Sequence, residues 1–100
     1  MALKIIDYGS PEYMQMIKLR DTVLRKPLGL SLSPEELEKE KENMLIGAFE
    51  EETMLGCCML VEEHPDVVRL RQMAVLKDLQ GKGIGRALMN FAENLARDRG

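Results

Sequence analysis

The spacing of hydrophobic residues changes along the chain and predicts both strands and helices. Apolar runs over residues 3–6, 44–49, 54–61 and 67–76 are typical of strands, and the two middle runs indicate an antiparallel hairpin. Residues 13–25 and 33–43 are predicted to be helical. A third helix is expected from about Gly83, because apolar residues then recur three and four positions apart: Ile84, Ala87, Leu88, Phe91, Ala92, Leu95 and Ala96. The predicted order is β-α-α-β-β-β-α, which makes an α/β domain.

The first two predicted helices have clear start signals. Residues 10–12 and 33–35 both read Ser-Pro-Glu, which supplies a capping hydroxyl, a proline suited to the first helical position and an acidic first turn. The Glu- and Lys-rich run over 35–42 is interpreted as a solvated helix face, since Leu37 is nearly its only apolar residue. We expect this second helix to lie on the surface or to cover a site.

The last predicted strand contains a change of phase. Apolar residues alternate with Arg69 and Arg71 up to Gln72, a polar residue at a position where the alternation requires an apolar one. Met73 and Val75 then take over the apolar phase. An inserted bulge residue produces such a shift, and bulges often lie beside active sites. The alternative is that Gln72 is simply exposed near an edge.

Composition narrows the classes of function. The chain has 100 residues, which is enough for one small domain. Its 14 Lys and Arg against 17 Asp and Glu, with only 4% aromatic residues, argue against a nucleic-acid partner. No apolar run approaches the roughly 18 residues of a membrane span, and the start lacks the apolar region of a signal peptide. We expect a cytoplasmic protein with no membrane partner.

Two adjacent cysteines, Cys57 and Cys58, lie within a predicted strand. Their side chains should point to opposite faces, so no disulfide between them is expected. With a single His in the chain, no metal site can be assembled from the spacing. A nucleophilic role would need an activating base, and none is visible, so these cysteines are predicted to fill the core.

A glycine-rich segment between the last strand and the last helix carries the clearest chemistry. Residues 80–86 read Gln-Gly-Lys-Gly-Ile-Gly-Arg. Glycines allow close approach of a ligand, the start of a helix attracts anions, and Lys82 and Arg86 add positive charge. The segment therefore predicts a phosphate or pyrophosphate site. Neither the Walker A loop nor the dinucleotide-binding fingerprint fits it, whereas the pattern Gln80-x-x-Gly83-x-Gly85 does.

This pattern resembles the signature of the GNAT superfamily of N-acetyltransferases, Q/R-x-x-G-x-G/A, which lies between a bulged strand and a helix and binds acetyl-CoA. Residues 67–100 match that segment, and the order of the preceding elements agrees with the family. The resemblance implies the acyl-CoA N-acyltransferase fold, a mixed, mostly antiparallel sheet flanked by helices. It also implies an enzyme that transfers an acetyl group from acetyl-CoA to a primary amine by direct attack in a ternary complex.

The resemblance also implies a cofactor site. Backbone N–H groups from Gly81 to Arg86 would hold the pyrophosphate, and the backbone of Met73 and Val75 would pair with the pantetheine arm. The bulge near Gln72 would open a slot for the thioester. The expected acetyl-CoA-binding residues are Met73, Ala74, Val75, Gln80, Gly81, Lys82, Gly83, Ile84, Gly85 and Arg86.

The catalytic residues are not identified by the resemblance. Family members often place a carboxylate or His on the bulged strand, where this chain has Arg69, Arg71 and Gln72. The Glu-Glu-His sequence at residues 62–64 is close by, but a Glu-rich hairpin end is more typical of solvated surface. The two arginines either attract an anionic group of the acceptor or are exposed strand cations. The loop over residues 25–32 resembles the region that covers the acceptor in the family.

The family fold continues beyond the helix at which this chain ends. The expectation is therefore a single N-acetyltransferase-like domain, residues 1–100, that is C-terminally incomplete. It would be either a truncated chain or a domain completed by a partner, for which a homodimer is one arrangement. The acceptor, a small-molecule or a protein amine, stays open. The alternative functions are a non-catalytic acyl-CoA-binding or regulatory module and a surface-interaction domain that binds no CoA.

Overall fold

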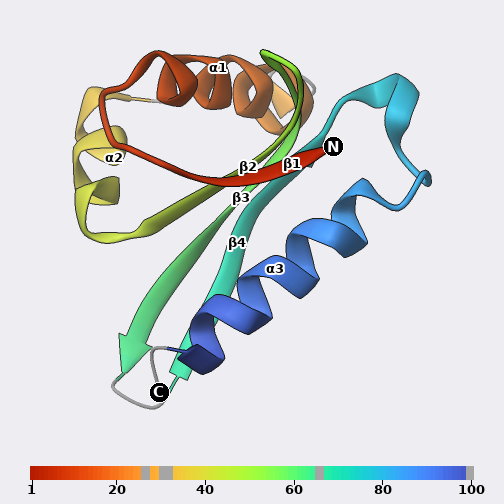
Figure 1. Ribbon diagram of the computed structural model, residues 1–100. Helices are drawn as coiled ribbons and strands as arrows, with labels where there is room; N and C mark the ends of the chain where they lie inside the picture. The colour runs from red at the N-terminus through yellow and green to blue at the C-terminus, as the bar shows by residue number, and fades with distance from the viewer. Residues whose placement is uncertain (26–27, 30–32, 65–66, 99–100) are drawn as a thin grey trace.

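A four-stranded antiparallel sheet with helices on both faces forms the protein (Figure 1). The computed structural model describes residues 1–25, 28–29, 33–64 and 67–98. The strands lie side by side in chain order: β1 (Ala2–Ile6), β2 (Met44–Glu50), β3 (Thr53–His64) and β4 (Val67–Val75). Every pair of neighbouring strands is antiparallel, so the predicted hairpin and the predicted order of elements are confirmed.

The helices begin at the predicted signals but differ in length from the prediction. They are α1 (Pro11–Arg20), α2 (Pro34–Glu38) and α3 (Ile84–Asp98), with a π-helical segment η1 (Asp21–Arg25) and 3-10 turns η3 (Lys39–Glu42) and η4 (Lys77–Leu79). Ser10 and Ser33 cap α1 and α2 by accepting backbone N–H groups at 3.2 Å. The helix predicted over 13–25 thus changes type at Asp21. Most of the 25–32 loop, expected to cover the acceptor, lies outside the described residues.

The sheet separates two hydrophobic cores. One lies under α1 and includes Met16, Phe49 and Met59, and the other lies under α3 and includes Ile46 and Leu88. Figure 1 shows α1 and α2 on one side of the sheet and α3 crossing the other. The amphipathic stripe predicted for α3 is confirmed, because its buried residues are Ile84, Leu88 and Ala92.

Gly56 in β3 sets the position of α3. A Cβ at this position would lie 3.0 Å from the Ile84 side chain and 3.1 Å from the Ala74 carbonyl oxygen. The absence of a side chain therefore lets the first turn of α3 approach the sheet closely. This contact holds the first turn of α3, which follows the glycine-rich segment, against β3.

A buried ion pair joins α1 to η3. Arg20 is fully buried, and its Nη1 and Nη2 donate to Glu40 Oε1 and Oε2 at 2.7 and 2.6 Å. Tyr13 Oη donates to the same Oε1 at 3.0 Å. The interpretation of residues 35–42 as a solvated face is wrong at Glu40, which is only 5% exposed. The reason is that the 3-10 turn after α2 directs this one carboxylate inward, onto the guanidinium of α1.

This cluster shifts the pKa values of its members. Burial, and then the hydrogen bond to Glu40, raise the pKa of Tyr13. Burial alone would lower the pKa of Arg20, but its hydrogen bonds to Glu40 and the charge of that carboxylate raise it. Arg20 therefore stays charged inside the protein, as a buried cation with a paired anion can.

Within the described ranges, no helix has the length and apolar character needed to cross a membrane.

Candidate functional site

The glycine-rich segment forms an exposed loop at the end of β4. Gly81 and Gly83 have φ angles of 83° and 88°, a left-handed conformation that residues with a Cβ rarely adopt. A Cβ built at Gly81, Gly83 or Gly85 would meet no atom within 4 Å, so the space above the loop is open. The three glycines thus combine an unusual backbone path with free access for a ligand.

The N-terminus of α3 presents unpaired donors to this open space. The first helical hydrogen bond runs from Ala87 N–H to the Gly83 carbonyl at 3.0 Å. The N–H groups of Ile84, Gly85 and Arg86 precede that bond and have no acceptor inside the helix. Gly83, the residue that precedes α3, has no side-chain oxygen that could accept these N–H groups. With the exposed Lys82 beside it, this helix end is an anion-binding arrangement.

The predicted bulge in β4 is confirmed. Cys57 lies opposite Ala74 and Met59 lies opposite Arg71, so one β3 residue faces two residues of β4, Gln72 and Met73. Gln72 has a φ of 56°, in the left-handed region, and Cys57 Sγ lies 4.0 Å from its carbonyl oxygen. The phase change in the sequence therefore marks an inserted residue, not just an exposed position.

The outer edge of β4 is open in the part of the sheet that the structure describes. Leu76 N–H donates to the Leu55 carbonyl at 2.9 Å, so the antiparallel alternation turns the N–H and C=O of Val75 away from β3. Gln80 Nε2 donates to the outward Val75 carbonyl at 3.1 Å. Sequence reasoning missed this link, which ties the first residue of the glycine-rich segment to the open edge.

A hollow of about 700 Å³ lies next to this edge, between η1 and the segment after β4. Its lining is Thr22, Val23 and residues 76–80. The π-helical turn that forms one wall had no clear signal in the sequence. The structure thus brings η1 and the start of the glycine-rich segment together.

Both cysteines are free and fully buried on opposite faces of β3, as predicted. Burial raises the pKa of each thiol to about 12. A protonated thiol without solvent access is not a nucleophile. The expectation that these residues fill the core is therefore consistent with the structure.

The candidate bases Glu62 and Glu63 are surface groups at the hairpin end of β3, where Glu62 lies opposite Val68 and not beside Gln72. Glu62 and Glu63 are exposed, and Glu63 Oε1 lies 3.2 Å from Arg69 Nε. The side chain of the neighbouring His64 lies outside the described part of the chain. Among the described residues, no group of three His, Cys, Asp or Glu side chains could hold a metal ion. The arrangement assigns no general base.

The bulged edge strand, the open glycine-rich loop and the free helix N-terminus together define the acyl-CoA N-acyltransferase fold. The model of the acetyltransferase (GNAT) family matches residues 12–100, and the chain belongs to this family. No curated protein sequence matches the chain significantly.

Solved structures share this fold. An aminoglycoside 6'-N-acetyltransferase complexed with coenzyme A superimposes with a TM-score of 0.83 at 19% identity, over 99% of this chain and 57% of the other. A putative N-acetyltransferase from Lactobacillus plantarum gives 0.79 at 25% identity, over 100% of this chain and 70% of the other. A Mycobacterium tuberculosis protein crystallised with CoA gives 0.76 at 23% identity, over 98% and 58%. This chain thus spans less than two thirds of the first and third of these proteins.

Proposed function

We propose that the protein binds acetyl-CoA and transfers its acetyl group to a primary amine of a small molecule. The proposal treats residues 1–100 as one acetyltransferase-like domain, because both helical layers pack on the same sheet. The observation that carries it is the open N-terminus of α3 at the end of a bulged edge strand. Membership of the acetyltransferase family and the CoA complexes of structural neighbours support it.

In the proposed complex, the pyrophosphate of CoA lies on the N–H groups of residues 81–86, with Lys82 and Arg86 beside it. The pantetheine arm pairs with the outward backbone groups of Met73 and Val75, as an added strand would. The side chain of Gln80 occupies the Val75 carbonyl in the free protein. A carbonyl oxygen has two lone pairs, so the arm can share this acceptor or displace the amide.

The bulge is the proposed position of the thioester. The amine nitrogen attacks the acetyl carbon, the carbon–sulfur bond breaks, and CoA leaves as a thiolate that takes up the proton lost by the nitrogen. A bulge leaves the backbone of its extra residue unpaired, so N–H groups near Gln72 are available to the developing oxyanion.

The test is calorimetric titration with CoA followed by an acetyl-transfer assay. CoA should bind at micromolar to millimolar concentrations, and acetyl-CoA with a panel of primary amines should release free CoA thiol. The buried Cys57 and Cys58 should not contribute to a thiol-reagent readout. Absence of binding heat at millimolar CoA would overturn the proposal.

The second candidate is a non-catalytic CoA-binding module. It is favoured by one observation: the bulged strand carries Arg69, Arg71 and Gln72 where family members often carry a carboxylate or His. General-base catalysis typically contributes about 10²–10⁴-fold, so a weak enzyme can function without it. CoA binding with no transfer to any amine in the panel would favour this candidate.

A further inference from the structure

A second hollow, of about 460 Å³, lies between β4 and the end of η1, directly before the bulge. Its walls are apolar on one side and cationic on the other. The lining consists of Leu24, Leu28, Arg69, Leu70, Arg71, Gln72 and Met73. It is distinct from the hollow beside the glycine-rich segment, which β4 residues do not line.

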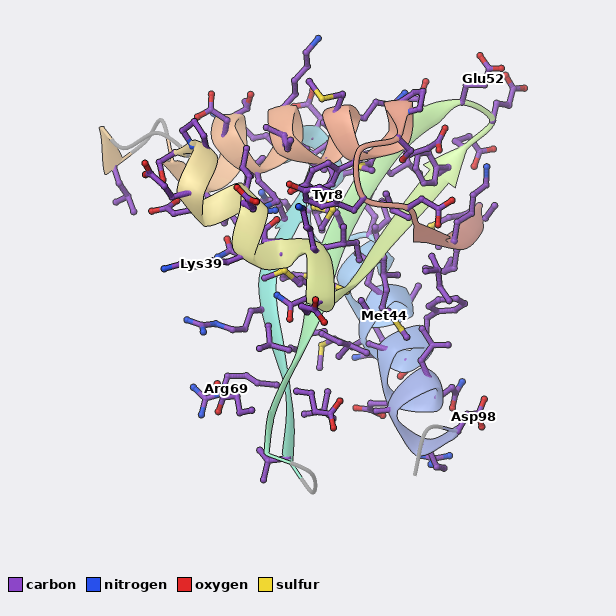
Figure 2. All side chains as sticks on the ribbon, turned by 90° about the vertical axis from the view of Figure 1, so that its left-hand side faces the viewer. Tyr8, Lys39, Met44, Glu52, Arg69 and Asp98 are labelled. Atoms are coloured by element: carbon purple, nitrogen blue, oxygen red, sulfur yellow. The ribbon has the colours of Figure 1, made fainter. Side chains whose placement is uncertain are left out.

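Both arginines extend on the α1 face of the sheet. Arg71 lies opposite Met59 and Arg69 lies opposite Val61, and these two β3 residues belong to the core under α1. In Figure 2 the side chain of Arg69 projects from the hairpin on the side away from Asp98, the last residue of α3. The arginines are therefore directed away from the α3 core and into the hollow that begins at the bulge.

The charge of this hollow is not neutralised by its own walls. None of the described residues that line it is acidic. Arg69 has Glu63 as a partner at 3.2 Å, but the Arg69 side chain is 60% exposed, so this pair is weak. Among the described residues, Arg71 makes no hydrogen bond or ion pair, and its neighbour Gln72 is the bulge residue.

From this geometry we propose that the acceptor carries a carboxylate close to its amine, as an amino acid does, and that Arg71 binds this carboxylate. The inference rests on the proposed function, since it assigns the acceptor of the same site. A guanidinium binds a carboxylate through two parallel hydrogen bonds, which also fixes its orientation. Arg71 is adjacent to the bulge, so a carboxylate held there leaves a nearby amine facing the thioester. Leu24 and Leu28 provide an apolar wall for the remainder of an amino acid.

The same charges disfavour a polycationic acceptor. Two arginines, with no acidic residue among the described part of the lining, repel amines that bear several positive charges. Aminoglycosides, which are acetylated by enzymes among the structural neighbours, are therefore expected to be poor acceptors here.

The test compares amino acids with their carboxamides: leucine, glutamine and glycine against leucinamide, glutaminamide and glycinamide. Equilibrium binding in the presence of CoA and KM in the transfer assay are both measured, for the wild type and for Arg71→Gln. At least one amino acid should bind tenfold or more tightly than its amide, and Arg71→Gln should remove most of that ratio. The KM for acetyl-CoA should change less than twofold. The amine of an amino acid and the amine of its carboxamide differ in basicity. This difference cancels when the ratio of their affinities is compared between the wild type and Arg71→Gln.

Two control variants separate recognition from charge and folding. Arg97→Gln, in the last turn of α3, makes the same change of net charge outside the hollow and should preserve the ratio. Arg71→Lys keeps the charge but loses the paired hydrogen bonds, so it should retain only part of the ratio. Equal binding of all three amino acids and their amides, or a ratio unaffected by Arg71→Gln, overturns the inference. Neither result affects the proposed function, which falls if CoA does not bind or if no amine in the panel is acetylated.

Discussion

Replacement of Gly85 by Glu should weaken CoA binding while stabilising the free protein. Gly85 is the second residue of α3, has no positive φ, and has open space where a Cβ would stand. A glutamate there improves helix propensity by about 0.5–1 kcal/mol, and its charge near the positive helix end adds about 0.3–1 kcal/mol. The free energy of unfolding should therefore rise by about 1 kcal/mol, which corresponds to about 4–8 °C in Tm for a domain of this size.

The same carboxylate should oppose a bound pyrophosphate. Two like charges about 4 Å apart repel by about 4 kcal/mol at an effective dielectric constant of about 20. Solvent around the exposed loop and dissolved salt both reduce this repulsion, so we take half of the value, about 2 kcal/mol. That value corresponds to a loss of about 30-fold in affinity for CoA.

Calorimetric titration with CoA and thermal unfolding of the same samples measure both effects. Gly85→Ala is the matched control, because it adds helix propensity without charge and should raise Tm with a much smaller effect on affinity. Gly83 is less suitable, since its φ of 88° would add backbone strain to any substitution. Wild-type affinity in Gly85→Glu, with the expected rise in Tm, would refute the assignment of the phosphate site to this helix end.

Three further predictions concern the scaffold. Glu40→Gln should lower the free energy of unfolding, measured by urea denaturation, by about 3–5 kcal/mol, because it leaves the buried Arg20 charge uncompensated. The apolar double variant Arg20→Met, Glu40→Leu should recover much of this loss. A loss below about 1 kcal/mol for the single change would contradict this account. Burial raises the pKa of Cys57 and Cys58 from 9.0 to about 12, so the free energy of unfolding should be full below pH 9 and fall by about 1.4 kcal/mol per pH unit for each thiol between pH 9 and 12. A urea midpoint unchanged between about pH 8 and 10.5 would argue against this. At the bulge, Gln72→Val should be less stable than Gln72→Gly by about 1–2 kcal/mol, since a β-branched residue is strained at a φ of 56°. Equal unfolding midpoints of the two variants would show that the left-handed conformation is not maintained.

The features that could be predicted from the sequence are those with local causes. Side chains in a strand alternate with a strict period of two, so the polar Gln72 out of phase left two interpretations, an inserted residue or an exposed position, and the structure shows the inserted residue. The start of α3 followed from the glycines and the apolar stripe after them. The serine caps of α1 and α2 likewise depend only on the next three residues.

The features that were missed depend on residues far apart in the chain. Glu40 belongs to a run of charges that looks like solvated surface, and only its contact with Arg20, twenty positions earlier, makes its burial favourable. Packing of α1 against the sheet and the switch to π-helix at Asp21 similarly have no local marker. The bond from Gln80 to the Val75 carbonyl needs the path of the turn between them, which the glycine spacing does not specify.

The pairing of Arg20 with Glu40 also bears on how this chain can change over evolutionary time. Apolar contacts tolerate gradual substitution, because one hydrocarbon side chain can replace another with small loss. A bidentate ion pair in the interior has no such intermediates, since altering either residue alone strands a charge. The two positions are therefore expected to vary together among related chains, or not at all, whereas the exposed charges on either side of Glu40 are free to drift independently.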